Sequence, residues 1–243
     1  MDFDGATFLE ALRSDALFQG VQLTIALTVV SFAFGIAIGL IVATLRDSRR
    51  RPLRAFAWAY IWVFRGVPTL VQLLFVWDAL PQLVPALKGE WFSPFIAATI
   101  ALSLNEAAYA AEIIRGGLLS IDDGQRLAAR ALGMLPRKVF TKVVAPQVVR
   151  VVIPTAANDF ITLLKITSLA SIISVHELMG YTQTEVASSF RFAEWFAACA
   201  IYYLVIVSIF MVGQAWLERR FVWTSVARGQ RSVIGGLPAM SRR

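Results

Sequence analysis

Five polar or charged residues interrupt the long apolar segments of this chain: Arg65, Asn105, Glu106, Asn158 and Asp159. Such residues are costly inside an apolar segment and are often functional. The Arg65 guanidinium can bind a carboxylate through two hydrogen bonds, and a carboxylate can hold an ammonium group. The same charges also suit internal ion pairs, in which Arg65 pairs with Glu106, Glu112 or Asp159. The sequence leaves both interpretations open.

Other kinds of chemistry find little support. His176 is the only histidine and Cys199 the only cysteine, which excludes a multi-histidine metal site and an internal disulfide. The sequence has no Gly-x-x-x-x-Gly-Lys-Ser/Thr phosphate loop. We therefore expect a protein that is not an enzyme, holds no metal and binds no cofactor of its own.

The elements that must position these residues are long apolar helices. The chain is 58% hydrophobic with a mean hydropathy of +0.66, above the roughly 45–50% apolar share of soluble domains. A bilayer span needs about 20 mostly apolar residues. Residues 17–45 and 195–217 carry no charge, and 55–80, 92–117 and 139–164 are long enough although each contains charge. The sequence predicts an all-α integral membrane protein, with five spans in a domain of residues 17–220.

The basic residues predict an orientation. Most of the 23 Lys and Arg residues fall in the first connection, around the third connection and near the C-terminus, and the positive-inside rule assigns these to the cytoplasm. Five spans then place residues 1–16 outside and the C-terminus inside. This topology explains the net charge of +7, so no nucleic-acid partner is expected. Residues 221–243 are polar and Gly-rich and are predicted to be a disordered tail.

A polar stretch between two apolar segments carries its own helix signals. Ser120-Ile121-Asp122-Asp123 is a Ser-x-x-Asp start, Gly133 suits a left-handed helix end, and Pro136 suits the first turn of the next helix. The prediction is a short helix over about 121–133, with Leu127, Ala131 and Leu132 on one face. An ordinary basic loop is the alternative.

The predicted outer segment 167–194 is long and mixed in composition. Its apolar part is too short to span a bilayer, so we expect a re-entrant or interfacial helix there. The sequence assigns it no role.

Four blocks of the chain resemble, in the family's order, the bacterial ABC importer permeases of the polar amino-acid branch. Ala128-Ala129, Gly133 and Pro146 resemble their EAA signature. The other blocks are Phe64-Arg65-Gly66-Val67-Pro68-Thr69 with Gln72, Ala108-Tyr109-Ala110-Ala111-Glu112-Ile113-Ile114-Arg115-Gly116-Gly117, and Asn158-Asp159-Phe160 through Leu164-Lys165-Ile166-Thr167-Ser168-Leu169. Together the blocks cover roughly residues 17–220.

The resemblance implies the MetI-like fold of type I ABC importers and a multi-pass permease subunit of the bacterial inner membrane, which moves polar amino acids by alternating access. The expected partners are a cytoplasmic ATPase dimer that uses ATP and Mg²⁺, a second permease subunit, identical or homologous, and an external solute-binding protein. The helix over 121–133 would be a coupling helix that docks on the ATPase. Its expected coupling residues are Gln125, Leu127, Ala128, Ala129, Arg130, Gly133 and Pro136.

The chain departs from the family pattern at three positions. Leu127 stands where the signature has Glu, Ala145 stands where a Leu precedes the Pro, and Ile166 stands where Asp is common. Losing the Glu removes an anion that could pair with a basic residue of the ATPase. Either a second permease carries the fuller motif, or Leu127 docks by apolar contact.

With an amino-acid substrate, the five intramembrane residues gain candidate roles. Arg65 would bind the substrate carboxylate, whereas Glu106 or Asp159 would hold an ammonium or basic side chain, with Asn105 and Asn158 beside them. Two rival functions remain open, an ion-coupled carrier acting alone and a membrane scaffold without transport. The identity of the substrate is also left open.

Overall fold

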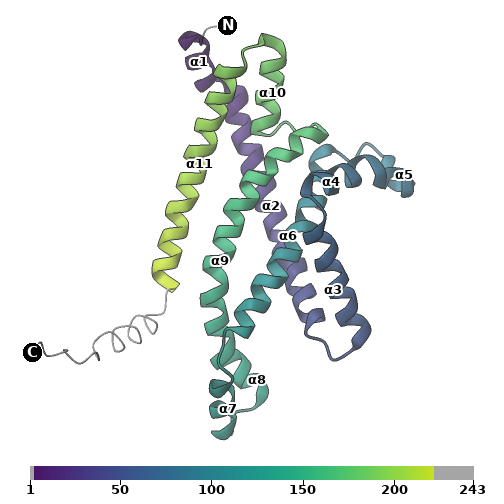
Figure 1. The fold of residues 1–243 in the computed structure, drawn as a ribbon, viewed down its shortest axis with the longest axis vertical. Coiled ribbons are helices and arrows are strands. Elements are labelled where there is room, and N and C mark those ends of the chain that lie inside the picture. The colour runs from purple at the N-terminus through teal and green to yellow at the C-terminus, as the bar shows by residue number, and fades with distance from the viewer. Residues whose placement is uncertain (1–2, 222–243) are drawn as a thin grey trace, which may run out of the picture.

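The computed structural model describes residues 3–221, in which every regular element is a helix. Figure 1 shows α2 running through the bundle from the α1 end, with α1 and α10 at one end of the molecule and α7 and α8 at the other. The α-helices are α1 (Gly5–Leu12), α2 (Asp15–Arg46), α3 (Arg51–Gly66), α4 (Thr69–Leu74), α5 (Leu80–Leu83), α6 (Pro94–Leu119), α7 (Asp123–Ala131), α8 (Pro136–Val139), α9 (Ala145–Ile166), α10 (Leu178–Ser189) and α11 (Phe192–Phe221). Two π-helical segments are η1 (Phe75–Ala79) and η3 (Phe140–Val144), and two 3₁₀ segments are η2 (Pro85–Lys88) and η4 (Thr167–Ile173).

Close packing of α2 against α6 forms the centre of the fold. Gly35 and Gly39 of α2 are four residues apart and lie on one face, where small residues let helix backbones approach. A Cβ atom at Gly39 would lie 2.7 Å from the Cβ atom of Ala110, and one at Gly35 would collide with the side chain of Glu106. These glycines therefore bring Glu106 into the centre of the helix bundle.

The second predicted span, residues 55–80, is wrong as a single helix. Two helical runs, Arg51–Gly66 and Thr69–Leu83, meet at an angle of 106°. Pro68 lacks a backbone N–H and disfavours helix at the residue before it, so α3 ends at Gly66. The carbonyl oxygens freed at the bend accept hydrogen bonds from the Gln72 amide, at 2.9 Å to Phe64 and 2.8 Å to Val67. Both carbonyl oxygens at the bend are therefore satisfied within the protein.

Prolines also account for the two π-helical segments. Pro81 and Pro146 each follow one of them by two residues, and neither can donate the usual helical hydrogen bond. The fourth predicted span, 139–164, lies within a longer helical run of 38 residues, Pro136–Ile173. This run includes the π-helical segment η3 and the 3₁₀ segment η4. The start of the predicted outer segment 167–194 thus continues this helix as η4, and the rest contains α10.

Length and composition support fewer spans than predicted. Within the described residues, three helical runs are apolar enough to cross a membrane: Asp15–Arg46, Pro136–Ile173 and Phe192–Phe221. The bent pair α3 and α4–α5 gives a fourth if it is counted as one span. Helix α6 has 26 residues but does not qualify, because polar residues such as Asn105 and Glu106 lower its hydropathy. The prediction of five spans is therefore not confirmed.

The structure describes most of the N-terminal segment but almost none of the C-terminal one. The predicted external segment 1–16 contains α1, which begins at an Asp4 cap and packs against α11. Of the predicted tail 221–243, all but Phe221 lies outside the described residues.

Candidate functional site: an exposed end helix and charged groups within the bundle

Helix α7 occupies most of the predicted 121–133 segment, and it ends with a left-handed Gly133, as predicted. Gly133 has φ +79°, its N–H donates to the Arg130 carbonyl at 2.9 Å, and the Met134 N–H donates to the Ala129 carbonyl at 3.2 Å. This pair of hydrogen bonds is the Schellman motif. Pro136 occupies the first turn of α8, as predicted.

The start of α7 differs from the prediction. The Asp122 side chain accepts from the Gly124 N–H at 2.6 Å, so Asp122 caps the helix. The Ser120 hydroxyl donates instead to the Gly117 carbonyl at the end of α6. The prediction of Ser120 as the cap was wrong. Ser120 and Asp122 are both residue types that cap helices, and they lie only two positions apart.

Side-chain contacts attach α7 to the ends of two long helices. The Gln147 amide of α9 donates to the Gln125 side chain at 2.6 Å, and Arg126 donates to the Leu118 carbonyl of α6 at 2.8 Å. Ala129 is buried in a cluster with Val139 and Val148. These contacts connect α7 to both α6 and α9.

The other side of α7 has no covering within residues 3–221. Leu127 is 64% exposed and Leu132 is 83% exposed, and the neighbouring Leu135 is also exposed. Of the remaining predicted coupling residues, Gln125, Ala128, Arg130, Gly133 and Pro136 are exposed, whereas Ala129 is buried. Apolar side chains presented together at a helix end indicate a surface for a partner protein.

Arg65 lies at the end of α3 and has internal partners. Its guanidinium is 3.8 Å from the Glu112 carboxylate and lies over the Tyr109 ring, 5.4 Å from the centroid. Of the ion pairs left open by the sequence, the structure forms the one with Glu112. The side chain is still 46% exposed and lines a pocket of about 400 Å³.

Glu106 and Asp159 come together from α6 and α9. Their carboxyl groups lie close enough to interact with each other. Glu106 Oε1 and Asp159 Oδ2 are buried, and beyond the neighbouring carboxyl group neither has a hydrogen-bond partner in the described residues. Two carboxylates side by side away from water repel each other unless they share a proton or a cation joins them. The pair can therefore hold either a proton or a cationic group.

The two asparagines do not join this acidic pair in the same way. The Asn105 amide donates to the Phe64 carbonyl at 3.0 Å and to Gln72 Oε1 at 3.2 Å, so it supports the bend between α3 and α4. Asn158 is exposed on α9. The structure thus brings together Glu106 and Asp159 and gives Asn105 an internal partner.

Sequence reasoning missed a buried carboxylate at the opposite end of the molecule. Glu177 is fully buried and accepts hydrogen bonds from the Gly180 and Met179 N–H groups at 2.8 and 3.0 Å, and from the Tyr203 hydroxyl at 3.0 Å. The Thr24 hydroxyl donates from 3.4 Å. Burial raises the pKa of Glu177 to about 7, although these donors favour the ionised form. The residue fastens α10 to α2 and α11.

Comparison with known proteins identifies the family. Residues 35–223 match the family described as binding-protein-dependent transport system inner membrane component. The chain belongs to this permease family. The ArgU arginine transport system permease protein of Corynebacterium glutamicum is 39% identical over 208 residues, which are 82% of this chain and 66% of that protein. The resemblance carried by the four sequence blocks is confirmed.

Solved structures of other permeases share the fold. An amino acid ABC transporter crystallised with histidines superposes with a TM-score of 0.83 at 31% identity, over 90% of this chain and all of that one. The MetNI methionine ABC transporter, in an inward-facing conformation, gives a TM-score of 0.68 at 22% identity, over 85% of this chain and 96% of that chain. The MetI-like permease fold is therefore confirmed, whereas its count of spans is not.

Proposed function

We propose that this chain is the membrane-spanning subunit of an ATP-driven, binding-protein-dependent importer of polar amino acids. The observation that carries the proposal is the exposed apolar side of α7, on a chain of this permease family. A helix that is anchored to α6 and α9 and open on its far side suits the transmission of movement from an ATPase.

The topology that fits this role has five spans, with the N-terminus outside and the C-terminus in the cytoplasm. The fifth span would be α6, which can be less apolar than the others because α2, α3 and α9 surround it. The basic residues near α7 favour a cytoplasmic location of that helix by the positive-inside rule.

The working complex would contain a second permease, two cytoplasmic ATPase subunits and an external binding protein. ATP and Mg²⁺ would be used by the ATPases. Closure of the ATPase dimer would move α7, and with it α6 and α9, so that the pathway changes from inward-facing to outward-facing. The relatives that carry arginine and histidine in their descriptions support amino acids as the cargo.

The acidic pair is the stronger candidate for contact with a basic or zwitterionic amino acid. Glu106 and Asp159 each offer a buried oxygen with no partner beyond the other carboxyl group, and an ammonium or guanidinium group would suit the pair. Asn105 and Asn158 would border this site. Arg65 would bind the substrate carboxylate by exchanging its Glu112 partner for it, which its exposure and long 3.8 Å ion pair allow.

Substitution of Arg65 tests the carboxylate contact. With Arg65→Ala, and also with Arg65→Lys, the KM for uptake is expected to rise at least about tenfold, because a bidentate charge-assisted contact contributes about 1.5–3 kcal/mol. Glu112→Gln is the matched control, since it removes the internal partner and keeps the guanidinium. An unchanged KM in both Arg65 variants would mean that Arg65 does not bind the substrate and only forms an internal ion pair.

Reconstitution tests the proposed function. The chain is placed in vesicles with its partner permease and an external solute-binding protein, with and without the partner ATPase, and uptake of labelled arginine and histidine is measured. ATP-dependent uptake is expected. ATP-independent uptake would favour the lone carrier, and no uptake in either condition would favour the scaffold.

A further inference from the structure

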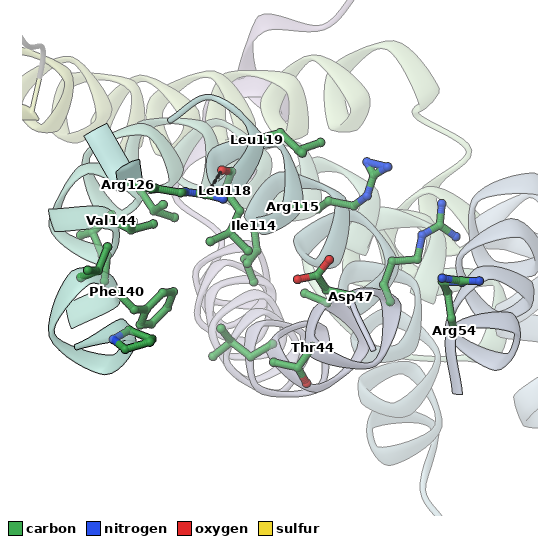
Figure 2. Close-up of a pocket in the computed structure, with 18 of the residues that line it drawn as sticks. Thr44, Asp47, Arg54, Ile114, Arg115, Leu118, Leu119, Arg126, Phe140 and Val144 are labelled. Carbon is green, nitrogen blue, oxygen red and sulfur yellow. Dashed lines mark hydrogen bonds between the residues drawn. The ribbon is translucent and has the colours of Figure 1, made fainter. Parts of the chain in front are cut away.

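A large basic cavity lies beside α7, and it shares Arg46 and Trp58 with the smaller pocket of Arg65. It has a volume of about 1270 Å³, is open on one side, and is lined by residues of α2, α3, α6, α7 and the run from α8 to α9. Six arginines line it, with Asp47 as the one carboxylate among the lining residues. Figure 2 shows Arg54 and Arg115 on one side of the cavity and Arg126 and Phe140 on the other. Its size exceeds the roughly 300–1,000 Å³ of pockets that bind drug-sized ligands.

Four of these arginines form no ion pair within the described residues, although Asp47 lines the same cavity and Glu112 lines the neighbouring pocket that Arg46 shares. Among residues 3–221, no ion pair involves Arg46, Arg51, Arg54 or Arg115. The Arg46 Nη1 atom is buried without a hydrogen-bond partner in this part of the chain. Arg126 differs, because Asp123 and the Leu118 carbonyl satisfy it in part. Unpaired guanidinium groups around one hollow favour an anion with several oxygen acceptors.

The remaining walls are apolar and accessible. Leu40, Trp58, Phe140 and Val149 line the same cavity and are each about half exposed. A small inorganic anion would leave these apolar side chains in water, whereas an acyl chain would cover them. The positive-inside rule explains why arginines gather at this end. It does not require them to surround one apolar cavity from four helices.

We propose that this cavity binds the headgroup of an anionic phospholipid, with its phosphate oxygens on Arg46, Arg51 and Arg54 and its acyl chains along Leu40 and Trp58. Basic pockets between spanning helices at the cytoplasmic side suit such headgroups. The bound lipid would neutralise the arginines and bridge α2 and α3 to the α7 end. The inference uses the orientation in the proposed function only to name the cytoplasmic leaflet.

Native mass spectrometry of the purified, delipidated full chain tests the site. The probes are phosphatidylglycerol and phosphatidylcholine with identical acyl chains, so that only the headgroup differs. Wild type is expected to bind phosphatidylglycerol at least about tenfold more tightly. Arg51→Gln/Arg54→Gln is expected to weaken that binding roughly twentyfold, since each basic residue near an anionic headgroup contributes about a factor of five. No ATPase or transport is involved, so a failure here is separate from a failure of the proposed function.

Matched variants distinguish the cavity from charge alone. Arg49→Gln/Arg50→Gln removes the same charge from the same connection but outside the lining, and a change below about threefold is expected. Ala55→Trp fills the cavity, keeps every arginine, and is expected to weaken phosphatidylglycerol binding as well. Circular dichroism of each variant checks that the helices are intact.

Three results would overturn the proposal. Equal losses in the two arginine pairs would mean diffuse attraction to positive charge. Displacement of the lipid by millimolar inorganic phosphate would mean a small-anion site. Unchanged lipid binding in Arg51→Gln/Arg54→Gln, together with altered self-association or ATPase binding, would mean that the cavity is a protein interface.

Discussion

The two ends of this molecule are organised in opposite ways. At one end α7 leaves Leu127 and Leu132 exposed and is fixed to the bundle from one side only. At the other end α10 is fastened by fully buried Glu177, which contacts α2 and α11 as well as its own helix. Figure 1 places the two helices at opposite ends of the long axis. Helix α7 is therefore held from one side and leaves its other side uncovered in the described residues, whereas α10 is held by buried contacts to two further helices.

This difference separates what substitutions at each end should change. A carboxylate that satisfies several buried donors contributes to stability, since removing it leaves those donors unpaired. Exposed leucines contribute little to the stability of the chain alone, because their side chains are not removed from water there. Substitutions near α7 should therefore alter coupling, and those near α10 should alter folding.

Gly133→Pro is expected to have the largest effect. Proline cannot adopt φ +79° and has no N–H to donate to Arg130, so the end of α7 and its link to α8 are lost at a cost of about 3 kcal/mol or more. ATP-driven uptake should fall about a hundredfold while the ATPase still hydrolyses ATP. Gly213→Ala, at a glycine with open space around it, is the control. Coupled uptake that survives Gly133→Pro would show that α7 geometry is unimportant.

Glu177→Ala should destabilise the chain by about 2–4 kcal/mol, because two backbone N–H groups and two hydroxyls lose their acceptor. Thermal unfolding in detergent measures this. Glu185→Ala, at a partly buried acid of the same helix whose carboxylate accepts no hydrogen bond within the described residues, is the matched control and should change stability by less than about 1 kcal/mol. Equal losses of stability in the two variants would show that the buried hydrogen bonds of Glu177 do not stabilise the α10 end.

The raised pKa of Glu177 predicts a pH dependence. Between the ordinary carboxyl pKa and about 7 the folded chain holds a proton that the unfolded chain has lost, so stability should fall as pH rises through this window. The effect across the whole window is about 3 kcal/mol. Glu177→Gln cannot titrate and should flatten this part of the profile. A wild-type profile that Glu177→Gln leaves unaltered would assign the dependence to other groups.

Leu127→Glu restores the family's acid and should have the smallest effect. Leu127 is exposed, so the stability of the chain should change by less than about 0.5 kcal/mol. We expect ATPase affinity within about twofold of wild type if the docking groove keeps a basic contact, as one charged pair at an exposed site contributes little. Affinity lowered more than about tenfold would show a groove that has become apolar to match leucine.

Features governed by neighbouring residues were predictable from the sequence. The left-handed Gly133, the first-turn Pro136 and the long apolar spans each depend on residues within a few positions. The family blocks also placed α7 correctly between two long helices. These signals determine local backbone geometry, for which no distant contact is needed.

Features that depend on distant contacts were not predictable from spacing. Nothing in the spacing of Asn105 and Gln72 shows that both amides would serve the bend at Pro68. The burial of Glu177 depends on Thr24 and Tyr203, which lie far away in the sequence. The pairing of Arg65 with Glu112 was one of three open alternatives, and helix packing selected it.

Cross-linking most directly tests the claim that α7 is the surface for the ATPase. Leu132→Cys at the α7 end and Phe192→Cys at the α10 end are compared in a Cys199→Ala background, since both positions are exposed and Cys199 is the only native cysteine. The assembled transporter is treated with a short bifunctional thiol reagent. We expect Leu132→Cys to cross-link to the ATPase and Phe192→Cys not to. Cross-linking from Phe192→Cys, or none from Leu132→Cys, would contradict the assignment of α7 as the docking helix.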